Sequence, residues 1–333
     1  MGDLFERICL PANLFAAWEK FRRGKRSKPD VMLFEYRLED NIFALCEELS
    51  GGRYRHGPYV PFTISDPKRR SIHKATVKDR VVHQAIANVV EPIFERRFIH
   101  DSYSCRVGKG THAAVKRLRT FLRQASMNDT RTVYTLKCDV RRFFASVDHG
   151  ILLSLLAKRI EDDRVMLLLR DIVGSFSTAP GLGIPLGNLT SQLFANIYLH
   201  ELDRYVKHDL REEYYLRYCD DFVTLGSHRR HLEDIAPRID GFLRDRLRIR
   251  LHPGKVSIRS WRQGVDFLGY VLMPHCTVLR TKTARRMLKR ACSENVASYL
   301  GLCGHADAHH LEHTIRNTVW IRTSSISRYP VPV

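Results

Sequence analysis

The sequence predicts an α+β fold with an antiparallel sheet, and three observations support that class. Segments of strand and helix character follow in the order β–α–α–β–β–α–β across residues 133–273, an order typical of helices packed on an antiparallel sheet. The run YYLRYCDDFVTLG, at 214–226, places β-prone stretches on both sides of two aspartates, which indicates a hairpin. Residues 1–50 have the character of helices.

Composition and charge narrow the functional class. The chain has 333 residues, of which 44 % are hydrophobic, enough for the core of two domains or of one domain with subdomains. Its formal net charge of +19 indicates a polyanionic partner, most simply a nucleic acid. An anionic membrane and a merely soluble basic protein are the weaker alternatives. We expect no membrane partner, because no apolar run reaches 18 residues.

The cysteines and the N-terminal residues indicate a cytoplasmic location. Eight cysteines are scattered along the chain without a CxxC pair, which fits a reducing compartment. The N-terminal run MGDLFERICLPANLF has early acidic residues and no long apolar stretch, so we expect no signal peptide.

The N-terminal half is expected to be mostly helical, with one hairpin. In LEDNIFALCEEL the apolar residues recur at spacings of three and four, which indicates an amphipathic helix. Residues 59–72 read as a strand, a basic turn and a second strand. A strong helix is expected at 78–95, and a glycine-rich loop leads into a basic helix at 105–124.

The C-terminal half supplies the expected sheet. By composition 131–140 is a strand, and a helix at 146–160 begins with Ser146 or Asp148 as its N-cap. The other expected elements are a glycine-rich turn feeding an apolar helix at 181–206, the hairpin, a helix leading to a short strand at 237–251, one strand at 265–273, and a helical tail from 271 on.

Three aspartates lie where strands are expected to end. Asp220 and Asp221 would repel each other within a sheet, but a turn at Cys219–Asp221 places them at its edge, where a divalent cation offsets the repulsion. Asp139 ends the β-prone run YTLKCD. Together Asp139 and Asp220 could bridge two Mg²⁺ ions about 4 Å apart, as in-line phosphoryl transfer requires. The alternatives are a helix cap for Asp139 and an acidic hairpin tip for the pair.

Six segments together resemble the reverse transcriptases. They are LKCDVRRFFASVDH, YCDDF, GIPLGNLTSQLFANIYL, LHPGKV, VDFLGY and RSIHKATVKDRVVHQA, which keep the family's order and spacing over about 60–290. The resemblance implies a right-hand polymerase fold. Its expected parts are an N-terminal helical extension at 1–60, fingers at 61–132, a palm at 133–273, and a short basic helical thumb with a tail at 274–333.

The central block narrows the resemblance. Leu186-Gly187-Asn188-Leu189-Thr190-Ser191-Gln192 is similar to the pattern of reverse transcriptases from diversity-generating retroelements, whereas most of the family has Gln before the glycine and Ser-Pro after it. This implies error-prone copying of a template-repeat RNA, with errors at adenines, for mutagenic retrohoming. The alternatives are a retron, group II intron or phage-defence reverse transcriptase, a catalytically inactive RNA-binding module, and a palm-fold nucleotidyl cyclase.

The resemblance also implies partners. They are a template RNA and its RNA–cDNA duplex, deoxynucleoside triphosphates, and a small basic accessory protein that is itself oligomeric. The source would be a bacterium or a phage.

The resemblance assigns roles to residues around the metals. Asp139, Asp220 and Asp221, with the main-chain oxygen of Val140, would hold two Mg²⁺ ions, which Mn²⁺ can replace. Phe144 would lie under the sugar and exclude a 2′-hydroxyl, although packing in the core is the alternative.

Other implied contacts concern the nucleotide. Lys68, Arg69 and Arg70 would grip the triphosphate, and Lys255 would protonate the leaving pyrophosphate. In the central block Gly187 would let the backbone approach the template base, and Gln192 would lie at the same site. Leu186 cannot make the hydrogen bond of the usual Gln, so we expect it to loosen base selection.

The last implied contacts concern the nucleic-acid strands. Gly269 and Tyr270 match the primer grip. A basic thumb helix would follow backbone phosphates, through Arg280, Lys282, Arg285, Arg286, Lys289 and Arg290.

Overall fold

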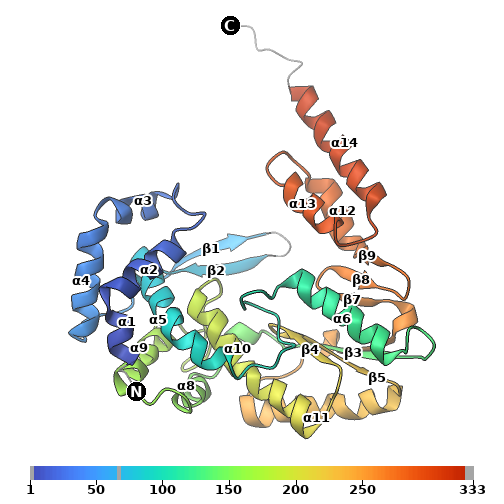
Figure 1. The fold of residues 1–333 in the computed structure, drawn as a ribbon, viewed down its shortest axis with the longest axis horizontal. Helices are drawn as coiled ribbons and strands as arrows, with labels where there is room; N and C mark the ends of the chain where they lie inside the picture. Colours follow the sequence, from blue (N-terminus) through green and yellow to red (C-terminus); the bar gives the residue numbers. More distant parts are fainter. Residues whose placement is uncertain (1–3, 66–68, 327–333) are drawn as a thin grey trace.

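The computed structural model describes residues 4–65 and 69–326. Figure 1 shows the N-terminal helices on one side, a sheet with its helices in the middle, and the last helices rising from the opposite side. The helices expected in the first 50 residues are confirmed: α1 (Leu4–Cys9), α2 (Pro11–Phe21), α3 (Pro29–Tyr36) and α4 (Leu38–Ser50). They form because their apolar residues recur on one face, and Leu14, Trp18, Ile42 and Leu45 are buried there.

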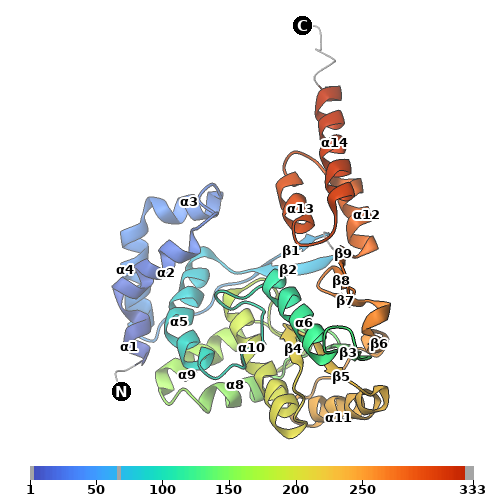
Figure 2. The same ribbon diagram turned by 45° about the vertical axis from the view of Figure 1, so that its right-hand side comes forward.

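A hairpin and a long helix follow these N-terminal helices. Strand β1 (Val60–Ile64) pairs antiparallel with β2 (Arg70–Lys74), as the sequence predicts. Helix α5 (Val77–Glu95) begins at Thr76, whose side chain accepts a hydrogen bond from the Asp79 N–H. In Figures 1 and 2 the hairpin extends from the N-terminal helices toward the side that carries the last helices.

The central sheet has four antiparallel strands in the order β4-β5-β3-β6, which confirms the predicted α+β class. Its strands are β3 (Tyr134–Asp139), β4 (Tyr215–Tyr218), β5 (Asp221–Gly226) and β6 (Ser257–Ser260). One face packs on α10 (Leu189–Arg204) and α11 (Arg229–Leu247), through Leu136, Cys138 and Phe222. The other face packs on α6 (Thr111–Ala125) through Val223 and Leu225.

Smaller helices connect the sheet strands. They are α7 (Phe143–Ser146), α8 (His149–Ala157), α9 (Asp163–Gly174), the π-helix η1 (Tyr205–Asp209), and the 3₁₀ turns η2 (Pro253–Lys255) and η3 (Trp261–Gln263). Of the two N-caps considered for α8, Asp148 is the one used, since it accepts a hydrogen bond from the Ile151 N–H at 2.9 Å. Helix α11 begins eight residues before the predicted start and continues through Pro237.

The single strand predicted at 265–273 is wrong. The structure has two strands, β7 (Val265–Phe267) and β8 (Tyr270–Leu272), which pair with each other, and β9 (Thr277–Leu279) completes a second sheet. Leu268 and Gly269 form the turn between β7 and β8, with φ angles of 50° and 93°. Two consecutive residues with positive φ make the tight hairpin turn that matches strand twist.

The C-terminal region is helical after β9. Its helices are α12 (Thr281–Arg290), α13 (Val296–Cys303) and α14 (His309–Ile326). They share an apolar core with the second sheet, in which Tyr270, Met287 and Tyr299 are buried. Across the described ranges, no helix has the length and apolar character of a membrane span.

Candidate active site

The turn between β4 and β5 carries Asp220. Cys219 and Asp220 alone connect the strands, and Cys219 has a φ of 55°. The three-residue turn expected at Cys219–Asp221 is thus one residue too long: Asp221 is the first residue of β5 and lies opposite Tyr218. A two-residue turn suffices because one left-handed residue reverses the chain within the twist of the strands.

The register of β3 and β5 brings the third aspartate to this turn. Asp139, the last residue of β3, is the direct partner of Asp221. The Val140 N–H donates to the Asp220 main-chain oxygen at 3.1 Å, and the His252 N–H donates to the Asp139 main-chain oxygen at 2.7 Å. The three aspartates therefore meet where the central strands β3 and β5 adjoin the β4–β5 turn, and Val140 lies beside them. They are Asp139, Asp220 and Asp221.

Asp221 is a carboxyl whose pKa is raised by its surroundings. Burial raises its pKa to about 6, the Lys137 ammonium opposes that rise, and the Asp139 and Asp220 charges add to it. The Lys137 Nζ atom lies 3.4 Å from Asp221 Oδ2. The other oxygen, Oδ1, is buried and has no hydrogen-bond partner among the described residues.

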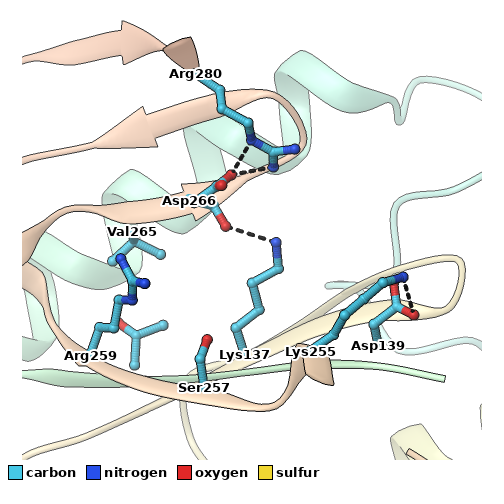
Figure 3. Close-up of a pocket in the computed structure, with 9 residues that line it drawn as sticks. Lys137, Asp139, Lys255, Ser257, Arg259, Val265, Asp266 and Arg280 are labelled. Carbon is cyan, nitrogen blue, oxygen red and sulfur yellow. Dashed lines mark hydrogen bonds and ion pairs between the residues drawn. The ribbon is translucent and has the colours of Figure 1, made fainter. Parts of the chain in front are cut away.

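Lys255 lies at the same edge. Its Nζ atom is 2.7 Å and 2.8 Å from the two carboxylate oxygens of Asp139, as Figure 3 shows. The side chain of Lys255 remains 44 % exposed, so this contact is open to replacement by a ligand. The structure thus places the predicted proton donor on a predicted metal-binding carboxylate.

The chemistry of these carboxyl groups fits the donor set that Mg²⁺ prefers. Within 4–65 and 69–326, no three His, Cys, Asp or Glu side chains already surround a common point closely enough to hold a metal. Hard carboxylate oxygens are nevertheless the donors that Mg²⁺ takes, usually one or two of them with substrate phosphates. The Oδ1 atom of Asp221 is buried and has no hydrogen-bond donor among the described residues, so a bound cation would satisfy it.

The two phenylalanines after Asp139 differ in exposure. Phe143 is buried, with 2 % of its surface exposed, whereas Phe144 is only partly buried. Their ring centroids lie 5.4 Å apart. The Phe144 carbonyl accepts a hydrogen bond from the Ile184 N–H at 2.8 Å. Phe143 therefore belongs to the core, and Phe144 is the one that still offers a surface.

The central block packs against the β1–β2 hairpin. The His73 N–H donates to the Leu186 main-chain oxygen at 3.1 Å, and Asn188 Nδ2 donates to the His73 carbonyl at 2.8 Å. Gly187 has a φ of 103°, and a Cβ there would lie 2.6 Å from Ile72 Cγ2. In this structure the close approach that Gly187 allows is to β2. Gln192 lies in the first turn of α10.

The predicted triphosphate grip lies on the hairpin. Arg69 and Arg70 are exposed, and Arg70 begins β2 opposite Ile64. Lys68 lies outside the described residues.

Two residues assigned to nucleic acid have other contacts. The Tyr270 side chain is 1 % exposed and its hydroxyl donates to the Leu302 carbonyl at 3.2 Å, so only the neighbouring turn at Leu268–Gly269 is open to a strand. Arg280 Nε donates to Asp266 Oδ1 at 2.8 Å, so its guanidinium is already paired. Their roles toward nucleic acid stay predictions, and strand pattern alone did not show these contacts.

The other basic residues of the predicted thumb lie on α12. Thr283 and Met287 form its buried face, and Arg286 is partly buried. The exposed members are Lys282, Arg285, Lys289 and Arg290.

Two residues of the site were missed from the sequence. Lys137 lies two residues before Asp139 and so on the same face of β3, a spacing that could have identified it. Arg217 is buried and pairs with Asp203 at 2.6 Å, and its Nη1 atom donates to the Cys219 carbonyl at 3.1 Å. It therefore supports the turn that carries Asp220. An arginine within the apolar run before Asp220 was the available signal.

Comparisons with known proteins identify the family of this chain. Residues 65–272 match the family model described as "Reverse transcriptase (RNA-dependent DNA polymerase)". Protein YkfC of Escherichia coli strain K12 is 28 % identical over 72 % of this chain and 73 % of its own length. The group II intron-encoded protein LtrA of Lactococcus lactis subsp. cremoris is 26 % identical over 50 % of this chain, but the match spans 28 % of LtrA.

A second intron-related protein and two solved structures are also similar. Nuclear intron maturase 4 of Arabidopsis thaliana is 27 % identical over 61 % of this chain and 25 % of its own length. The telomerase of Candida albicans has a TM-score of 0.55 at 10 % identity, over 85 % of this chain and 58 % of that chain. Apo telomerase of Candida tropicalis has a TM-score of 0.50 at 12 % identity, over 80 % and 56 %. These two structures support the right-hand polymerase fold.

Proposed function

The chain belongs to the reverse transcriptase family, and we propose that it polymerises DNA on an RNA template by two-metal nucleotidyl transfer. The observation that carries this proposal is the pairing of Asp139 with Asp221, next to the Asp220 turn. The proposed substrates are a template RNA, the growing RNA–cDNA duplex and deoxynucleoside triphosphates.

Different residues of the chain would bind the metal ions, donate the proton, select the sugar and bind the triphosphate. Bound Mg²⁺, held by Asp139, Asp220, Asp221 and the Val140 carbonyl, would activate the primer 3′-hydroxyl and neutralise the triphosphate. Lys255, released from Asp139, donates a proton from Nζ to the leaving pyrophosphate. Phe144 excludes the 2′-hydroxyl of a ribonucleotide by steric overlap. Arg69 and Arg70 bind triphosphate oxygens through their guanidinium groups.

Primer extension with an RNA template tests the proposal. Asp220→Ala combined with Asp221→Ala should abolish Mg²⁺-dependent DNA synthesis, because two of the three carboxylates are lost. Asp234→Ala, which removes an exposed aspartate from α11, is the control and should extend the primer like the wild type. Equal extension by the double variant and the wild type would rule out this metal site.

We further propose that the DNA product is error-prone and serves mutagenic retrohoming, together with a small basic accessory protein. The central block supports this, because Leu186 replaces a glutamine and cannot hydrogen-bond near the base or sugar. In the structure only the Leu186 main chain is bonded, to His73.

Sequencing the cDNA from an adenine-containing RNA tests the role of Leu186. Leu186→Gln should lower misincorporation opposite template adenine. Leu33→Gln, at an exposed leucine of α3, makes the same chemical change elsewhere and should leave the errors unchanged. An adenine error frequency that does not differ between Leu186→Gln and the wild type would contradict the role.

A group II intron reverse transcriptase is the second candidate. It is favoured by the similarity to LtrA and to the Arabidopsis intron maturase. The RNA that copurifies with the chain from its own cells separates the two. A structured intron RNA would favour the intron type, and a transcript containing a template repeat would favour retrohoming.

A further inference from the structure

A pocket of about 250 Å³ lies between the two sheets, beside Asp139. Figure 3 shows β3 and β6 forming one wall, and Asp266 and Arg280 facing them from the second sheet. The first wall is lined by Thr135, Lys137, Asp139, Lys255, Ser257 and Arg259. Pocket residues thus extend away from the candidate metal carboxylate along the sheet.

The polar wall follows from the strand register. Side chains two residues apart share one face of a strand, and Thr135 lies opposite Arg259 while Lys137 lies opposite Ser257. Asp139 and Lys255 continue the series through their ion pair. On the same sheet face β5 carries Val223 and Leu225, which are buried under apolar contacts.

The contrast between the two halves of this face is informative. A sheet face that meets a second sheet is normally apolar, because burying polar groups without partners is unfavourable. Six side chains of the pocket wall, from β3, β6 and the turn η2, are hydroxyl-bearing or charged instead; among them Thr135 is buried, whereas Lys255 and Arg259 are exposed. They extend over about 13 Å of strand, at about 3.3 Å per residue. A hydrophilic ligand would satisfy these groups.

Two donors in the pocket have no protein partner within the described ranges. The Thr135 hydroxyl belongs to a side chain only 2 % exposed, and it makes no hydrogen bond. Arg259, directly opposite it, forms no ion pair with a described residue. By contrast Lys137 donates to the Asp266 carbonyl at 2.9 Å, and Arg280 pairs with the Asp266 carboxylate.

The charge of the pocket indicates an anion. Lys137, Lys255, Arg259 and Arg280 supply four cations against the two carboxylates of Asp139 and Asp266. A guanidinium beside a free hydroxyl is a donor set suited to phosphate oxygens.

We propose that this pocket binds pyrophosphate as it leaves the catalytic carboxylates, with Arg259 and Thr135 as its principal donors. The proposal rests on the proposed polymerase function, because one end of the pocket is Asp139 and Lys255, where the leaving group would form. A compact anion fits a space of about 250 Å³ walled by two sheets. The phosphodiester of a nucleic-acid strand is the other source of the same chemistry.

Calorimetric titration of the full chain with sodium pyrophosphate tests this in EDTA, so that no metal holds the anion. Arg259→Ala should weaken binding at least tenfold, and Thr135→Val about threefold. Arg259→Lys, which keeps the charge, should recover part of the affinity. Arg238→Ala, which removes an exposed arginine of α11, should bind like the wild type. Equal affinity for Arg259→Ala and the wild type would overturn the proposal.

Two further measurements separate the ligand sources and the two proposals. Affinity for an RNA–DNA duplex should change less than twofold in Arg259→Ala; a tenfold loss for the duplex with unchanged pyrophosphate binding would make the pocket a strand site. Thermal unfolding of each variant shows whether it is folded. The calorimetry needs no polymerisation, so wild type that binds pyrophosphate but fails to extend a primer would contradict the proposed function and leave the pocket standing.

Discussion

At the scale of single residues, Asp221 combines burial with two neighbouring carboxylates. Its side chain is 20 % exposed, and Lys137 offsets only part of the cost of its charge. An ionised carboxylate in such surroundings destabilises the folded chain unless a cation joins it. The candidate metal site is thus also a site of intrinsic instability, as is common where function requires burial of charge.

The pKa of Asp221 gives a stability prediction with a defined pH window. The unfolded chain releases this proton near pH 4, whereas the folded chain keeps it until about pH 6. Below pH 4 Asp221 is protonated in both states and does not lower the free energy of unfolding. The free energy of unfolding then falls as the pH rises through 6, because the folded chain has to ionise a buried carboxyl. Asp221→Asn cannot ionise, so in EDTA at pH 7 it should be more stable than wild type by up to about 3 kcal/mol.

Urea unfolding at several pH values checks this. The difference between Asp221→Asn and the wild type should shrink to zero at pH 4, while Asp234→Asn on α11 should show no such pH dependence. Lys137 keeps its bond to the Asp266 carbonyl in the variant, so its second contact is preserved. A stability difference that does not change between pH 4 and pH 7 would contradict the assigned cause.

At the scale of elements, the junction between β2 and the loop before α10 depends on Gly187. Its φ of 103° is strained for any other residue, and a Cβ would lie 2.6 Å from Ile72 Cγ2. The hydrogen bonds between His73 and both Leu186 and Asn188 fix the same junction. The hairpin that carries Arg69 and Arg70 is thereby positioned relative to the central block.

Gly187→Ala should loosen this junction. We expect a loss of about 1–3 kcal/mol in the free energy of unfolding, from the strained φ and the contact with Ile72. Adding Ile72→Ala should remove the steric contact with the new Cβ, so it should recover only that share of the lost unfolding free energy and not the share due to the strained φ. Gly241→Ala, at an open position within α11, should instead stabilise the chain by up to about 1 kcal/mol.

Urea unfolding measures these differences, and single-nucleotide incorporation measures the KM for the deoxynucleotide. A raised KM for Gly187→Ala would show that the junction positions the hairpin for the substrate. Unchanged stability in Gly187→Ala would contradict the strain read from its φ.

Elements with a strong periodic pattern could be predicted, and those set by tertiary contacts could not. The helices of residues 1–50 and the β4–β5 hairpin were expected because apolar spacing determines both. Strands β6 and β9 have four and three residues, too few for an alternating pattern. The β7–β8 turn was missed because Leu268, a residue that disfavours positive φ, occupies its first position.

In the candidate site, too, some residue positions could be predicted from the sequence and others could not. Asp139 and Asp220 could be expected to meet because each ends a β-prone run. Tyr270 and Arg280 could not be placed, since their contacts with Leu302 and Asp266 depend on how the second sheet packs. The Thr135 hydroxyl, which has no hydrogen-bond partner in the described part of the chain, likewise becomes apparent only from the register of β3 with β6.

At the scale of the whole molecule, the basic residues behind the net charge of +19 differ in whether their position lets them contact a nucleic acid. Helix α12 presents exposed basic residues at helical spacings of three and four, while Thr283 and Met287 face the core. In Figure 2 α12 lies with α13 and α14 on the side toward which the β1–β2 hairpin extends, and α11 lies on the far side of the central sheet. Basic residues on α12 and basic residues on α11 therefore carry the same charge but lie on different sides of the molecule.

Salt dependence distinguishes charge at α12 from charge elsewhere. Each phosphate contact contributes about 0.9 to the slope of log Kobs against log salt concentration. Lys282→Ala with Arg285→Ala should thus lower the slope for an RNA–DNA duplex by about 2, equally for different sequences, because phosphates carry no base information. Arg238→Ala with Arg246→Ala removes the same two charges from α11 and should leave the slope unchanged. Fluorescence anisotropy between 50 mM and 200 mM salt measures both, and equal slopes for the two double variants would mean that net charge, not α12, binds the duplex.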